Sequence, residues 1–192
     1  LRGSWLREMA QSGSSSLAPV LFEFWGDRDG QERFGLQNAS TPEARARLYR
    51  RLERHDAAVR EWRSAASDAE SAWDEASRLS SALTDAAKVP MALTSEVDAL
   101  DTLRSQIPSW NEVGLGRMAT QACYELAAAL GDDEGARCWS TAERWRSQLT
   151  SFPLVGRRAA LAAAQRWGSA EDVARLQAAV DEEHQRIYGD RQ

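Results

Sequence analysis

The chain has 192 residues, enough for one domain or a short run of stacked repeats that needs no disulfide or metal for stability. Its net charge of −5 argues against a strongly electrostatic nucleic-acid binder, because phosphate contacts usually need a basic surplus. No apolar run approaches the roughly 18 residues of a membrane span, so we expect no membrane association.

The N-terminal part of the sequence predicts two short helices and a loop. Residues 5–11 and 17–25 have helical composition and are separated by a serine-rich stretch, whereas residues 26–38 read as loop. The chain starts without a methionine or a signal-peptide pattern, which we interpret as a fragment of a longer protein. We therefore expect residues 1–39 to form an N-terminal unit and residues 40–192 a single helical domain.

A long helical stretch follows. Thr41 stands before a proline and a glutamate, a combination that predicts the start of a helix reaching to about Leu52. Residues 56–88 contain neither glycine nor proline, and their apolar residues fall at three- and four-residue steps. The spacing predicts one long amphipathic helix, ended by Val89-Pro90 because a residue before proline avoids helical geometry. The members of this stripe are Trp62, Ala66, Ala69, Trp73, Ala76 and Leu83.

The rest of the sequence predicts five further helices with clear boundaries. They cover residues 94–106, 113–130, 133–149, 154–167 and 170–188. Prolines and glycines fall between them, and Asp132 and Ser169 are placed to cap the helices that follow. Strand signals are nearly absent, so the predicted fold class is all-α, built from antiparallel helical hairpins with short loops.

Three helix–turn–helix segments can be laid over one another. Their turns fall at Glu53, Gly131 and Gly168, which is close to a period of 39 if one hairpin around Val89-Pro90 is skipped. The first segment resembles the tetratricopeptide repeat family in its small and aromatic residues. The matching positions are Ala46, Tyr49, Ala58, Trp62 and Ala65. The resemblance implies a short array of stacked hairpins with a concave inner surface.

The sequence also departs from that family. Trp139 and Leu176 sit one position early in the second and third segments, and the period exceeds 34 residues. The unbroken stretch of residues 56–88 favours a non-repetitive helical bundle, because a repeat array should turn near Ser67. Array and bundle both stay open at this point.

No pattern in the sequence indicates catalysis. Phosphate loops and hydrolase motifs are missing, and His55 and His184 are expected to be solvated surface side chains. Cys123 and Cys138 have no metal-ligand spacing and are expected to be small buried thiols in a reducing, cytoplasmic compartment. We therefore predict a non-enzymatic protein without cofactor or metal.

The strongest candidate for a binding feature is a run of arginines in the first repeat. By the family's pattern Arg47, Arg50 and Arg51 would face the inner surface, and Arg158 could join them from the third repeat. Guanidinium groups suit carboxylates or phosphates because they donate hydrogen bonds in a fixed fork. Trp110 lies near a helix end, where an exposed indole could anchor an interface. Four other tryptophans lie on helix stripes and are expected in the core: Trp62, Trp73, Trp139 and Trp145.

These features predict a protein-interaction scaffold or regulatory module. The expected partner is another protein or a peptide, acidic if the arginines contact it. The alternative is a small helical subunit of a nucleic-acid-handling complex, with the arginines on the phosphate backbone.

Overall fold

The computed structural model describes residue 22 and residues 26–111 and 114–189. This part of the chain consists of helices and the turns that connect them, without strands. The all-α prediction is therefore confirmed. None of these helices is both long and apolar enough to cross a membrane. The helices are α3 (Arg28–Asn38), α4 (Pro42–Arg51), α5 (His55–Ser67), α6 (Ala72–Ala86), α7 (Thr94–Arg104), α8 (Gly114–Ala129), α9 (Asp133–Arg146), α10 (Leu154–Trp167) and α11 (Ala170–Tyr188).

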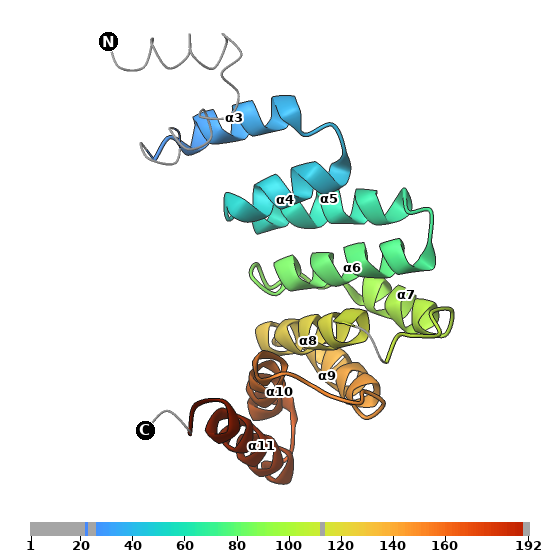
Figure 1. Ribbon diagram of the computed structural model, residues 1–192, viewed down its shortest axis with the longest axis vertical. Helices are drawn as coiled ribbons and strands as arrows, with labels where there is room; N and C mark the ends of the chain where they lie inside the picture. Colours follow the sequence, from blue (N-terminus) through green and yellow to red (C-terminus); the bar gives the residue numbers. More distant parts are fainter. Residues whose placement is uncertain (1–21, 23–25, 112–113, 190–192) are drawn as a thin grey trace.

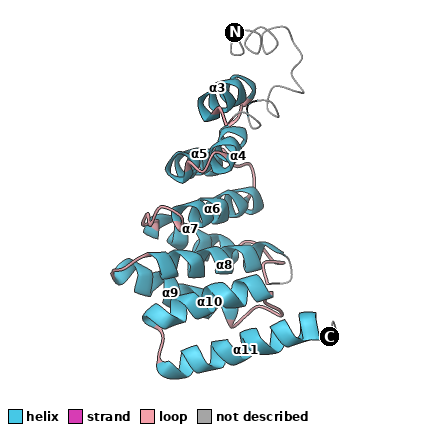
Figure 2. Ribbon diagram, turned by 90° about the vertical axis from the view of Figure 1, so that its left-hand side faces the viewer, coloured by secondary structure: helices cyan, strands magenta, loops and turns pink. Residues whose placement is uncertain are grey.

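The helices stack into an elongated molecule, with α3 at one end and α11 at the other (Figures 1 and 2). Sequential helices pack against each other, as α4 with α5 and α8 with α9. Alternate helices also meet, because α8 lies between α6 and α10. Helix α8 is thus the most enclosed element, whereas α11 packs on α10 alone among the stronger helix contacts of the described chain.

The stretch predicted as one helix is two helices joined by a turn. Helix α5 ends at Ser67, and the Ser71 hydroxyl accepts a hydrogen bond from the Asp74 amide to start α6. A serine cap competes with helix continuation without any glycine or proline. The single-helix prediction is wrong, and the turn falls near Ser67, where a repeat array should have it.

The loop predicted for residues 26–38 is also wrong, since residues Arg28–Asn38 form α3. The Asp27 side chain caps this helix by accepting from the Gly30 amide at 2.8 Å. A Cβ atom added to Gly35 would stand only 2.6 Å from the Leu48 side chain, so glycine lets α3 approach α4 closely. The short helices predicted at residues 5–11 and 17–25 lie outside the described residues, apart from Phe22.

Other boundaries agree with the predictions. Thr41 caps α4, Asp132 caps α9, and Ser169 forms a reciprocal capping box with Asp172 at the start of α11. A turn at Val89-Pro90 separates α6 from α7. The alternate helices α5, α7, α9 and α11 begin at residues 55, 94, 133 and 170, in steps of 39, 39 and 37 residues.

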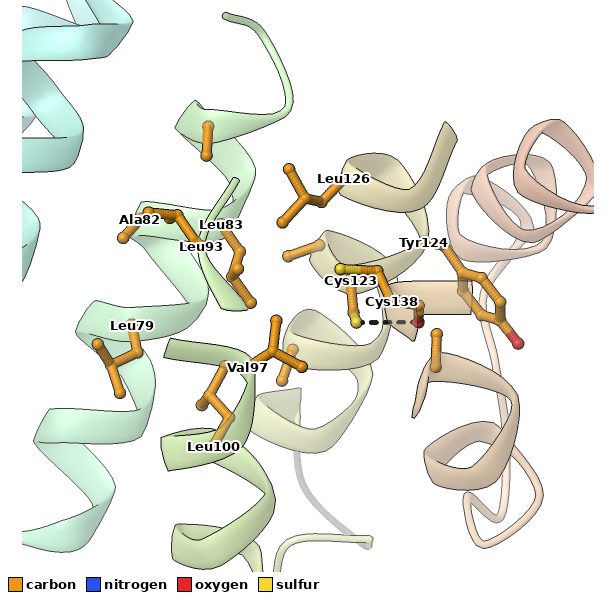
Figure 3. Close-up of a cluster of buried hydrophobic side chains, with 14 of the residues drawn as sticks. Leu79, Ala82, Leu83, Leu93, Val97, Leu100, Cys123, Tyr124, Leu126 and Cys138 are labelled. Carbon is orange, nitrogen blue, oxygen red and sulfur yellow. Dashed lines mark hydrogen bonds between the residues drawn. The ribbon is translucent and has the colours of Figure 1, made fainter. Parts of the chain in front are cut away.

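The core is built mainly from leucine and alanine side chains between neighbouring helices (Figure 3). Tryptophans connect these layers through their indole N–H groups. Trp62 donates to the Asp85 carboxylate at 2.8 Å, Trp145 to Asp101 at 2.7 Å, and Trp167 to the backbone carbonyl of Ala127 at 2.7 Å. Each indole therefore fills apolar space and fixes the position of an adjacent helix.

Candidate functional site

The predicted arginines of α4 do not form one free cationic patch. Arg50 points toward α6, and Arg47 is exposed but bonded to Glu43 one turn earlier. Arg45 and Arg54, on either side of them, pair with Glu61 and Glu32. Arg158 lies on α10, on a separate exposed helix face. The structure therefore does not gather these side chains into one site.

Arg50 belongs to a polar cluster around Asp85, whose side chain is only 2% exposed. The Arg50 guanidinium donates to that carboxylate from Nε at 2.9 Å and Nη2 at 2.7 Å. His55 Nδ1 lies 2.8 Å from the other carboxylate oxygen. The Trp62 indole N–H also donates to the Asp85 carboxylate. The Arg50 guanidinium lies 5.1 Å from the centroid of the Trp62 ring. We call these four residues the Asp85 cluster.

The Asp85 cluster connects α4, α5 and α6. Three side chains form hydrogen bonds with the buried carboxylate, and a buried charge is tolerated when its hydrogen-bonding positions are occupied in this way. His55 was expected to be a solvated surface side chain, and that expectation is wrong because it packs against Asp85. The three partners lie 23, 30 and 35 residues from Asp85 in the sequence, so no local pattern indicates them.

Large apolar side chains are also exposed on α6, α8 and α10. Trp73 on α6 is 41% exposed, Met118 on α8 is 37% exposed and Val155 on α10 is 57% exposed. These three helices pack in succession, with α8 in the middle. Arg158 is exposed one turn beyond Val155. We call these four exposed residues, which lie on three helices that pack side by side, the open face.

Two tryptophan predictions are reversed. Trp73 was expected in the core but is exposed, because it stands in the first turn of α6 rather than in the middle of a long helix. Trp110 was expected to be an exposed anchor but is 1% exposed and packs edge-on against Trp145. Trp62 and Trp145 are buried as predicted, and Trp139 is partly buried.

A groove of about 730 Å³ lies between α3 and α4. Its lining includes Phe34, Leu48 and Leu52 as apolar side chains and Arg28, Arg51 and Glu53 as charged ones. Arg51, a predicted binding residue, is therefore placed at this groove. We call it the α3–α4 groove.

The two cysteines are the next potentially reactive groups, and both are buried in the core. Cys123 and Cys138 are free, buried thiols that lie close together between α8 and α9, and the Cys123 thiol donates to the Cys138 carbonyl at 3.3 Å (Figure 3). The interaction with the Cys138 side chain and the burial raise the pKa of Cys123 well above its usual value, which keeps the thiol protonated. Within the described chain no group of histidine, cysteine or acidic side chains is placed to hold a metal ion.

Tyr124, next to Cys123, is equally enclosed. Burial and the hydrogen bond to Glu143 raise the pKa of its phenol far above 10, because the phenolate would be both desolvated and close to a carboxylate. The hydroxyl therefore stays a hydrogen-bond donor that links α8 to α9.

Comparison with known protein families, with curated proteins and with solved structures finds no match for this chain. The resemblance to the tetratricopeptide repeat family stays a prediction from the sequence.

Proposed function

We propose that this chain is a non-catalytic scaffold that binds a partner protein across the open face. The observation that carries the proposal is the exposure of Trp73, Met118 and Val155 on three alternate helices that pack side by side. Single exposed apolar residues are ordinary, but a series across adjacent elements is typical of an interaction surface. Large side chains with some flexibility, such as tryptophan and methionine, contribute strongly to such contacts.

The electrostatics of the first hairpin support a protein partner over a nucleic acid. The arginines expected to contact phosphate are largely engaged by carboxylates, as Arg50 is by Asp85 and Arg54 by Glu32. A phosphate backbone would have to displace those partners. Arg158, exposed beside Val155, is suited to an acidic residue at the edge of an apolar contact. We further propose that the chain acts in the cytoplasm, where its two free cysteines stay reduced.

The proposal is tested by exchanging exposed apolar residues in two places. One variant replaces Trp73, Met118 and Val155 with alanine; the control replaces Ile187 and Tyr188, which are exposed apolar residues of α11 and are not part of the open face. All five are surface positions, so both variants should keep the helical circular dichroism of the wild type. Each protein is immobilised and exposed to native lysate, and recovered proteins are quantified.

We expect a stoichiometric protein to be captured by the wild type and by the α11 control but not by the open-face variant. Equal capture by all three, or no stoichiometric protein, contradicts the proposal. Binding of single- or double-stranded nucleic acid at low salt that falls steeply with added salt supports the nucleic-acid alternative instead.

A further inference from the structure

The α3–α4 groove is a second concave surface, separate from the open face. Phe34 and Gly35 of α3 line one side, and Leu48 and Leu52 at the end of α4 line the other. Its volume of about 730 Å³ falls within the range of sites that enclose a small ligand or a few side chains. The groove therefore has the size and the apolar lining to hold one or two apolar side chains of a partner.

Of the charged side chains at the rim of this groove, two are paired with each other and one is not. Arg28 pairs with Glu53 at 3.2 Å, so these two compensate each other. Glu53 is held in a left-handed backbone conformation, with φ of 59°, at the end of α4. Arg51 is exposed at the same rim and forms no ion pair or hydrogen bond with the described residues. One positive charge is left without a counter-charge beside an apolar surface.

We propose that the α3–α4 groove binds a peptide segment of another protein in which an apolar side chain stands next to a carboxylate. The apolar side chain packs against Phe34, over the buried side chains of Leu48 and Leu52, and the carboxylate accepts hydrogen bonds from the Arg51 guanidinium. A carboxylate beside that guanidinium is favoured because arginine donates two parallel hydrogen bonds to it. A basic segment is disfavoured, since it would meet Arg51 while the carboxylate of Glu53 is already engaged by Arg28.

The test uses a defined peptide, acetyl-Ser-Leu-Phe-Glu-Ser-amide, and its glutamine counterpart. The peptides are titrated into the full ¹⁵N-labelled chain while the backbone amide signals are followed. We expect signals of Gly35 and Ala44, both lining the groove, to shift, and the glutamate peptide to bind about 2–5-fold more tightly than the glutamine peptide, as for one partly exposed ion pair.

Two charge-reversal variants distinguish binding at the groove from a general effect of the protein's charge on peptide affinity. Arg51→Glu should weaken the glutamate peptide about fivefold or more and remove its advantage over the glutamine peptide. Arg60→Glu makes the same change on the exposed surface of α5, where Arg60 pairs with Asp56, and should leave both affinities within about twofold.

Several outcomes would overturn the inference. These are no shift at millimolar peptide, equal losses for the two charge reversals, shifts confined to the open face, or equally tight binding of octanoate, which would indicate a small carboxylic acid as ligand. Shifts confined to the open face would overturn the inference and favour the proposed function, whereas the other outcomes leave that function untouched, because the open-face variant keeps Arg51 and the groove intact.

Discussion

At the scale of single residues, Asp85 is the side chain with the most demanding surroundings. A buried carboxylate is tolerated only when its lone pairs are occupied, and Arg50, His55 and Trp62 occupy them. Arg50 is still 38% exposed, so its attraction to Asp85 is partly screened by solvent. The contribution of the cluster to stability therefore comes from the completeness of the hydrogen bonding more than from the charge pair alone.

The substitution Asp85→Asn should lower the free energy of unfolding by about 2–3 kcal/mol. This is less than the roughly 3–5 kcal/mol usual for breaking a buried ion pair, because Arg50 is partly exposed and can turn toward solvent. Urea denaturation followed by circular dichroism measures the change. Asp98→Asn, which breaks the exposed pair with Arg137, should cost no more than about 1 kcal/mol. Equal effects of the two substitutions would show that the Asp85 cluster adds little.

At the scale of elements, the ends of helices decide the path of the chain. Helix α4 ends in a Schellman motif, in which the Arg54 amide donates to the Tyr49 carbonyl at 2.9 Å and the Glu53 amide to the Arg50 carbonyl at 3.1 Å. This motif needs a left-handed residue at Glu53, a position that glycine usually occupies. The strained glutamate turns the chain from α4 into α5 and brings its side chain to the α3–α4 groove.

Replacing Glu53 with glycine should therefore stabilise the protein by about 0.5–1 kcal/mol. Relief of the left-handed strain outweighs the greater freedom of glycine in the unfolded chain and the loss of an exposed ion pair with Arg28. Thermal or urea unfolding measures the gain. Glu53→Ala, which keeps the Cβ atom, should show no such gain. If both substitutions lower stability equally, then the ion pair matters more than the backbone strain.

Element boundaries also show what could be predicted from the sequence. The caps at Thr41, Asp132 and Ser169 were predictable because a cap and its amide partners are a few residues apart. The turn between α5 and α6 was missed because serine, not glycine or proline, marks it, although Ser71 followed by Asp74 was a readable signal. Misplacing that turn also put Trp73 in the core.

The candidate sites were less predictable than the helices. The Asp85 cluster joins residues of three helices, and only the folded chain reveals that Arg50 is occupied. Arg51 differs from Arg50 by one position but faces the α3–α4 groove, since neighbouring helix positions point about 100° apart. Trp110 could not be distinguished from an exposed anchor, because its burial depends on the position of Trp145 in α9.

At the scale of the whole molecule, the stacking makes stability uneven along the chain. Helix α8 is enclosed by α6, α7, α9 and α10, whereas α3 is supported mainly by α4 and α11 by α10. Leu176 and Val180 are the only buried residues of α11. Terminal helices of such a stack lose fewer contacts when they open, so they should open at lower free energy than the centre.

Amide hydrogen exchange should show this gradient directly. We expect the slowest exchange in α8, intermediate exchange in α6 and α10, and the fastest in α3 and α11, because local opening of the end helices exposes less apolar surface. Exchange followed by mass spectrometry of peptic peptides resolves these helices. Identical protection in α8 and α11 would mean that the described helices unfold as one unit.

The enclosure of both native cysteines between α8 and α9 has a practical consequence for spectroscopy. Because Cys123 and Cys138 are buried and the chain contains two cysteines in all, thiol reagents should leave the folded wild type unmodified. A cysteine introduced at Val155, the most exposed large apolar residue among those described, would then take up a fluorescent dye selectively. Such a dye would report directly on contact between the open face and an approaching protein.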